Sequence, residues 1–249
     1  MGFLDFLFSK EKAQERQLGK LRKTLTNMWV QSPERNYAAE QLRNIGTDDA
    51  LMILMERFKH TAQNTTYDNE EKMYVYDLLV SMGPTVIDVV KRFIREEPEK
   101  INWPMKVLDD LLSGDEMASY IQSLLADMTI DYERNPEKKE QILIRARDFA
   151  SHEGLQKEVA RFSEDDNEGI RFIAVDAVSK QDADWAAQAL RNNLRIEDSG
   201  RVLQIACEKL VETGWTAIDE EEDEQIRADI LDNLPNTYLL TEEGALKHK

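Results

Sequence analysis

The chain has 249 residues, of which 41% are hydrophobic and 33% charged, and its formal net charge is -17 at pH 7. This composition is typical of a soluble, helix-rich folded protein, and the acidic charge disfavours nucleic acid as a partner. The single cysteine, Cys207, excludes a disulfide within the chain, and 10 Gly and 6 Pro are too few for the many turns of a β-sandwich or β-barrel.

Residues 1–32 combine an apolar cluster with a basic stretch, and we expect them to form an atypical N-terminal capping segment. The apolar cluster consists of Phe3, Leu4, Phe6, Leu7 and Phe8. A stretch rich in Lys and Arg follows it at residues 10–23. Three interpretations of the apolar cluster stay open: a cap packed on the helices that follow, a segment that docks on a partner, and an anchor on an anionic membrane surface.

From residue 33 onward one pattern of apolar and small residues recurs along the chain. It is first seen at Arg35, Ala38, Ala39 and Leu42, at offsets of 0, 3, 4 and 7. The same offsets return at Lys72, Val75, Tyr76 and Leu79, at Arg171, Ala174, Val175 and Val178, and at Leu203, Ala206, Cys207 and Leu210, with weaker copies at Pro104, Val107, Leu108 and Leu111 and at Ile142, Ala146 and Phe149. These offsets place the residues on one stripe of an α-helix, and small residues in the stripe allow a neighbouring helix to approach closely.

Each copy is followed by a short break and then by a second amphipathic segment. The breaks contain the turn residues Gly46, Gly83 and Gly114. The second segments lie at residues 51–58, 86–93, 117–128, 155–162 and 187–194. The repeating unit is therefore helix, tight turn, helix, and its anchor positions at residues 42, 79, 111, 149, 178 and 210 are spaced 29 to 38 residues apart.

With this repeating unit, residues 33–215 resemble the HEAT-repeat family. Residues 166–194 carry the closest match to the degenerate consensus of that family, including Ile170, Arg171 and Ala174. Tetratricopeptide repeats have a similar length, but their consensus Trp, Gly-Tyr and terminal Pro positions are not reproduced. The resemblance implies an all-α fold, with an α-solenoid of about six antiparallel helix pairs between atypical capping ends.

Residues 216–240 are predicted to form an acidic loop and a C-terminal capping helix. The acidic run at 219–224 is typical of a solvated loop, and docking of a basic partner or of a divalent cation is the alternative. The helical stripe then returns once more at Arg227, Ile230, Leu231 and Leu234. Residues 241–249 show no periodicity, and we expect them to form a disordered tail.

The resemblance also implies a binding surface, because the second helices of HEAT repeats usually line the concave face. The expected partner-binding residues are the apolar cluster and the outward-facing cations of the second segments, which are Lys91, Arg92, Arg95, Arg161 and Arg191. Two interpretations stay open for the four tryptophans: they line a ligand groove, or they fill gaps between repeats. These tryptophans are Trp29, Trp103, Trp185 and Trp215.

None of the familiar catalytic or metal-binding motifs occurs in the sequence. Glycine-rich phosphate loops, the Gly-x-Ser-x-Gly elbow and His-Glu-x-x-His are all missing, and His60, His152 and His248 are far apart. We therefore expect no catalytic residue, no metal and no cofactor. We also expect the cytoplasm, because no apolar run approaches the length of a membrane span and no secretory signal is recognisable.

The expected function is that of a non-enzymatic protein–protein interaction module or scaffold. It would bind a partner protein, whose identity the sequence leaves open, on its curved surface or through the apolar cluster. A lyase or another enzyme on the same HEAT-like scaffold is one alternative. A peripheral membrane adaptor anchored by residues 3–8 is the other.

Overall fold

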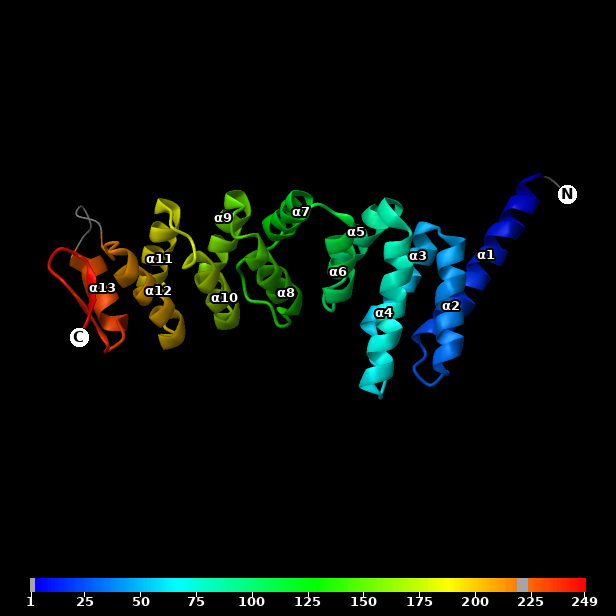
Figure 1. The fold of residues 1–249 in the computed structure, drawn as a ribbon, viewed down its shortest axis with the longest axis horizontal. Coiled ribbons are helices and arrows are strands. Elements are labelled where there is room, and N and C mark those ends of the chain that lie inside the picture. The colour runs from blue at the N-terminus through cyan, green and yellow to red at the C-terminus, as the bar shows by residue number, and fades with distance from the viewer. Residues whose placement is uncertain (1–2, 219–223) are drawn as a thin grey trace. The chain divides into compact units, whose positions relative to one another are not determined.

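The structure is a computed structural model that describes the backbone of residues 3–218 and 224–249 and the side chains of residues 12–218 and 224–249. These residues form α-helices and one small two-stranded sheet, which confirms the expected all-α class (Figure 1). The chain divides into two compact units, Met1–Ser113 and Gly114–Lys249, called unit 1 and unit 2 below.

Unit 1 is built from α-helices that pack in consecutive layers (Figure 1). Its helices are α1 Phe3–Thr26, α2 Ser32–Ile45, α3 Asp48–Met55, α4 Thr65–Ser81, α5 Ile87–Glu96 and α6 Asn102–Leu111, with the 3-10 segments η1 Glu56–Lys59 and η2 Gly83–Val86. α2 packs against α1, α3 and α4. α4 packs against α6, and α3 packs against α5.

The repeated stripe forms the core of unit 1, as α2 illustrates. The four residues of its stripe are the four that α2 buries. The helix ends at Gly46, which adopts the left-handed conformation that glycine accepts without strain and donates its N–H to the Leu42 carbonyl. Thr47 then caps α3 by accepting a hydrogen bond from the Ala50 N–H. The stripe and the turn together therefore produce the predicted helix, tight turn and helix.

Unit 2 is also built mainly from α-helices, and it contains the small sheet. Its α-helices are α7 Gly114–Ala126, α8 Glu137–Ala146, α9 Glu153–Arg161, α10 Glu168–Val178, α11 Asp184–Ile196, α12 Gly200–Thr213 and α13 Glu224–Asn233, its 3-10 segments are η3 Arg147–Phe149 and η4 Phe162–Glu164, and its strands are β1 Tyr238–Leu240 and β2 Leu246–His248. α10 packs between α8 and α12. α9 packs against α7 and α11, and α11 packs against α13.

The C-terminal residues correct one prediction, because 241–249 are not a disordered tail. β2 pairs with β1 in an antiparallel sheet, with Tyr238 opposite His248. Tyr238 is buried and its hydroxyl donates to Glu208 Oε2 of α12 at 2.6 Å. Strands of three residues are too short to show periodicity, and part of the support of the hairpin comes from Glu208 of α12, which lies 30 residues before Tyr238. Of the predicted acidic run at 219–224, residues 219–223 lie outside the described residues and Glu224 begins α13.

Among the described residues, no single helix is both long and apolar enough to cross a membrane. α4 and the helical segment Gly83–Glu96 meet the length and composition criteria only when taken together, and the chain bends by 112° between them. Both segments pack inside unit 1, where Val75 and Leu79 of α4 and Val90 of α5 are buried.

Candidate functional site

Two adjoining pockets open on unit 1 near the N-terminal ends of α2 and α4. The first, of about 470 Å³, is lined by Met28, Trp29, Gln31, Ser32, Arg35, Thr61, Ala62, Gln63, Asn64 and Tyr67. The second, of about 640 Å³, is lined by Ser32, Pro33, Asn36, Tyr37, Glu40, Tyr67, Glu70 and Tyr74. The two pockets share Ser32 and Tyr67 in their linings, and we call the two together the aromatic cleft.

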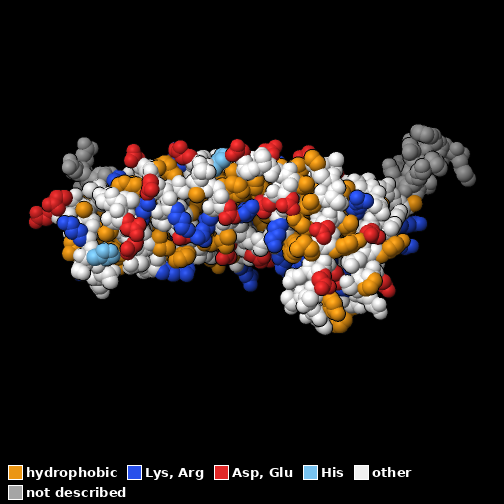
Figure 2. Space-filling model, in the orientation of Figure 1, with side chains coloured by type: hydrophobic (Ala, Val, Ile, Leu, Met, Phe, Trp, Pro, Cys, Tyr) orange, Lys and Arg blue, Asp and Glu red, His pale blue; other side chains and the backbone are white. Residues whose placement is uncertain are grey.

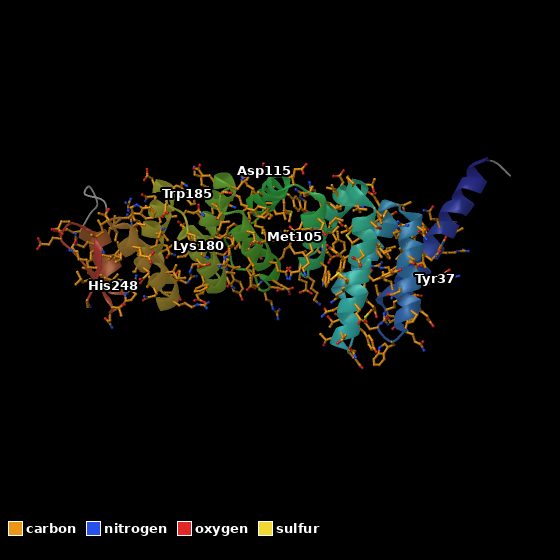
Figure 3. The ribbon with its side chains drawn as sticks, viewed as in Figure 1. Tyr37, Met105, Asp115, Lys180, Trp185 and His248 are labelled. Atoms are coloured by element: carbon orange, nitrogen blue, oxygen red, sulfur yellow. The ribbon has the colours of Figure 1, made fainter. Side chains whose placement is uncertain are left out.

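Four aromatic rings dominate the lining of the aromatic cleft. Trp29 is 86% exposed, Tyr37 62% and Tyr67 57%, whereas Tyr74 is half-buried. Figure 3 labels Tyr37 on α2, and Figure 2 shows hydrophobic and acidic side chains on the surface over this end of α2 and α4. Large exposed apolar side chains that gather in one place mark interaction sites, and Trp and Tyr are enriched among the residues that dominate binding energy.

A buried ion network lies directly behind the aromatic cleft. It consists of Arg35, Arg57, Asp68, Glu71 and Lys72, all of them buried. Glu71 Oε2 accepts from Arg35 Nε at 2.8 Å and from Arg57 Nε at 2.9 Å. Asp68 accepts from Arg57 Nη2 and from Lys72 Nζ, both at 2.7 Å. Three cations face two carboxylates, so the network carries one excess positive charge.

Both carboxylates of the ion network are held in their charged form. Burial raises the pKa of Glu71, but hydrogen bonds from Arg35, Ser32 and Arg57 outweigh this effect, so its pKa lies below the usual value. Burial likewise raises the pKa of Asp68, and the hydrogen bonds from Lys72, the Ala62 N–H and Arg57 reverse the direction. Both carboxylates are therefore ionised at neutral pH, and a buried charge is tolerated only when it is paired.

The ion network fixes the two loops that form the first pocket. Arg35 Nη1 donates to the Val30 carbonyl and, at 3.4 Å, to the Met28 carbonyl, which places the loop that carries Trp29. Arg57 Nη1 donates to the His60 carbonyl at 2.8 Å. Asp68 Oδ1 also accepts from the Ala62 N–H, at 2.9 Å, so the loop at residues 60–64 is held at two points.

Asn64 completes the support by capping α4. Its side chain accepts from the N–H groups of Thr66 and Tyr67 at 3.0 and 3.2 Å. This cap satisfies two of the N–H groups that a helix leaves unpaired at its start. Tyr67, which lines both pockets, therefore lies in a first turn of α4 that the Asn64 cap holds in place.

The open side of the aromatic cleft is acidic. Glu40 and Glu70 line the second pocket, and no Lys or Arg is found among the described residues that line it. Glu40 Oε1 accepts the hydroxyl of Tyr74 at 2.8 Å; burial and this hydrogen bond raise the pKa of Tyr74. The one cation in the lining of the first pocket is Arg35, whose guanidinium is already bound to Glu71 and to the loop carbonyls.

The predicted N-terminal site lies outside the part of the chain whose side chains are described. The backbone of Phe3, Leu4, Phe6, Leu7 and Phe8 belongs to α1. The three interpretations of these residues, as a cap, as a docking segment and as a membrane anchor, therefore stay predictions.

The predicted cations of the second helices lie in two different units. Lys91, Arg92 and Arg95 are all on α5 of unit 1, where Arg92 pairs with Asp48 at 3.1 Å. Arg161 and Arg191 belong to unit 2 and bind backbone carbonyls there: Arg161 Nη2 lies 2.9 Å from the Leu125 oxygen, and Arg191 Nε lies 2.8 Å from the Thr216 oxygen. None of these five cations lines the aromatic cleft.

Sequence reasoning missed most of the aromatic cleft, although one signal was readable. Tyr37 and Tyr74 both lie two positions after the first residue of their stripes, Arg35 and Lys72, and therefore away from the buried side of two successive first helices. Of the four tryptophans, Trp29 lines a groove. The other three pack: Trp103 stacks on Phe58, with ring centroids 6.0 Å apart, and Trp185 and Trp215 contact the core of unit 2.

The cysteine and the possible metal ligands of the described residues give less indication of a functional site than the aromatic cleft. The thiol of Cys207 is buried, and burial raises its pKa to about 12, so the reactive thiolate is scarce at neutral pH. Within residues 12–218 and 224–249, whose side chains are described, no three His, Cys, Asp or Glu residues gather in a way that could hold a metal ion. The aromatic cleft is therefore the feature on which a functional argument can be built.

No protein-family model matches the chain, and a search of curated proteins gives no match.

Proposed function

We propose that the chain is a non-enzymatic interaction module of HEAT-like repeats and that it binds a partner protein at the aromatic cleft. The observation that carries the proposal is the group of exposed rings at Trp29, Tyr37 and Tyr67, which are mounted on backbone that the buried ion network and the Asn64 cap hold in place. Rigid aromatic side chains provide a large contact area at a low cost in conformational entropy, since they have few rotatable bonds to fix.

The repeat part of the proposal is supported by the packing inside each unit. In unit 1 the first helices α2, α4 and α6 contact one another in sequence, and in unit 2 the first helices α8, α10 and α12 do the same. The second helices follow a parallel order, with α3 against α5, and with α9 between α7 and α11. We propose that these helices form an α-solenoid of about six helix pairs. The edges and loops of such a solenoid are free to carry a binding site.

Photo-crosslinking tests the proposal directly. A photoreactive phenylalanine derivative placed at Tyr67 should give a discrete crosslinked product in extract of the native host, because the ring borders both pockets. The matched control is the same photoreactive derivative placed at Tyr132 of unit 2, which is more exposed than Tyr67, at 69% against 57%, but lies outside the cleft. The product should appear only at Tyr67.

A second substitution links the product to the aromatic cleft. Adding Trp29→Ala to the Tyr67 variant should remove the crosslinked product, whereas adding Tyr37→Phe, which keeps the ring, should preserve it. Equal crosslinking at Tyr132 and Tyr67, or no effect of Trp29→Ala, would refute binding at this cleft.

A further inference from the structure

The lining of the aromatic cleft narrows the kind of partner segment that fits it. Grooves that hold an amphipathic helix are lined mainly by aliphatic and methionine side chains, which receive one apolar face of the helix. Here the aliphatic contribution is small, with Met28 and Ala62 in the first pocket and Pro33 in the second. Aromatic rings, amides, hydroxyls and charged groups provide the remainder, so the lining does not suit a helical face.

An extended segment containing proline matches this lining. In the polyproline II conformation the backbone carbonyls stay exposed, and they need donors such as the side-chain amides of Gln31, Asn36 and Gln63, which line the cleft. Proline rings are compact and apolar, and they pack against aromatic faces such as those that Trp29 and Tyr67 could provide. Such a segment is also largely preformed, so it loses little conformational entropy on binding.

The acidic lining of the second pocket favours a partner segment that also contains a basic residue. Glu40 and Glu70 line the second pocket beside the rings of Tyr37, Tyr67 and Tyr74. A Lys or Arg placed there would meet carboxylates and aromatic faces together, and both attract cations. Arg35 lines only the first pocket, and its buried guanidinium is paired with Glu71, so it is not among the residues that a Lys or Arg in the second pocket would meet.

We infer that the aromatic cleft binds an extended, proline-containing segment of a partner protein, with a Lys or Arg of that segment seated between Glu40 and Glu70. The inference rests on the proposed function and specifies the chemistry of its partner.

The test uses the full chain and an array of synthetic peptides of about twelve residues, roughly 37 Å long in the polyproline II conformation. Each peptide carries prolines three positions apart and an Arg at one end. The strongest binder is titrated by calorimetry beside three comparison peptides. In these, the prolines are replaced by Ala, the Arg is replaced by Glu, or the whole peptide is an amphipathic Leu/Lys helix.

We expect the original peptide to bind at least about tenfold more tightly than all three comparison peptides. Trp29→Ala should weaken its binding at least about tenfold, and Glu40→Lys combined with Glu70→Lys should remove the preference for Arg over Glu. Tyr132→Ala is the matched control and should leave binding unchanged. All substituted side chains are exposed, so circular dichroism should show an unaltered fold.

The outcomes separate the two proposals. If the array gives no binder, or if the helical peptide binds best, the inference is overturned, while crosslinking at Tyr67 would still support the proposed function. If the peptide binds but does not compete with crosslinking at Tyr67, the cleft does not bind this segment and the inference is likewise overturned. Loss of both signals would overturn both proposals.

Discussion

At the residue scale, burying the ion network costs hydration free energy, but the network also positions the loops of the first pocket. Buried ion pairs often stabilise a fold no more than well-packed apolar residues would, because both charges lose their hydration. In this protein Arg35 and Arg57 also donate to backbone carbonyls of the two loops that border the first pocket, which apolar side chains could not do. The network therefore explains why the loops of the aromatic cleft keep a defined shape.

Replacing Glu71 by Gln tests this role. At pH 7 the substitution should lower the free energy of unfolding by about 3 kcal/mol, because it leaves Arg35 and Arg57 buried without their shared carboxylate. The folded-state pKa of Glu71 is depressed, so its contribution is present above the unfolded value of 4.5 and is lost as the pH falls through the lower folded-state value. The difference between wild type and variant should therefore narrow as the pH falls below about 4.5.

Urea unfolding followed by far-UV circular dichroism, in steps from pH 7 to about pH 3, measures that difference. Glu70→Gln is the control, since this neighbouring carboxylate is exposed and should leave stability unchanged at every pH. A gap between wild type and Glu71→Gln that stays constant with pH would contradict the ionic role.

At the scale of single elements, the C-terminal hairpin depends on one backbone position. Gly244 has a φ of 81°, and a Cβ atom there would lie 2.8 Å from the Ile218 carbonyl oxygen. The Gly244 carbonyl accepts the N–H of Ala217 at 2.8 Å, which ties the hairpin to the segment that follows α12. The close approach and the positive φ both require glycine here.

Two glycine-to-alanine substitutions should consequently change the free energy of unfolding in opposite directions. Gly244→Ala should destabilise unit 2 by more than about 1 kcal/mol, from the strained φ together with the clash. Gly19→Ala, in the exposed middle of α1 with no atom near the new methyl group, should stabilise the protein by about 0.5–1 kcal/mol. Thermal unfolding of the two variants beside wild type measures both effects; equal signs would contradict the argument.

The helices could be predicted from sequence because their signals are local. The stripe at Arg35, Ala38, Ala39 and Leu42 states which face of α2 is buried without reference to any other element. The aromatic cleft could not be predicted in this way. Its loops are set by contacts such as Arg35 to Glu71, which are 36 residues apart, and exposed rings such as Tyr37 look like ordinary surface residues until those contacts are known.

At the scale of the whole molecule, each unit has its own buried residues. The core of unit 2 includes Leu190, Leu203 and Leu210, whereas the residues that line the aromatic cleft and those of the ion network all belong to unit 1. The aromatic cleft is therefore assembled by residues of unit 1 alone.

A cavity in unit 2 should consequently leave the aromatic cleft intact. Leu203→Ala should lower the stability of unit 2 by about 2–5 kcal/mol, because it removes a buried side chain that cannot be fully replaced by relaxation. The NMR signal of the Trp29 indole N–H should keep its wild-type position under native conditions. Leu42→Ala, in α2 of unit 1, is the comparison variant and should shift that signal; a shift with Leu203→Ala would contradict the independence of the cleft.

Trp29 has a spectroscopic consequence, because it differs from the other three tryptophans. Its ring is mostly in water, whereas Trp103, Trp185 and Trp215 are packed against protein. Indoles in water emit at longer wavelengths than shielded ones, so we expect Trp29 to dominate the red edge of the intrinsic emission and to be the first to be quenched by a collisional quencher such as acrylamide. The chain thus carries its own unlabelled optical probe of whether the cleft is occupied.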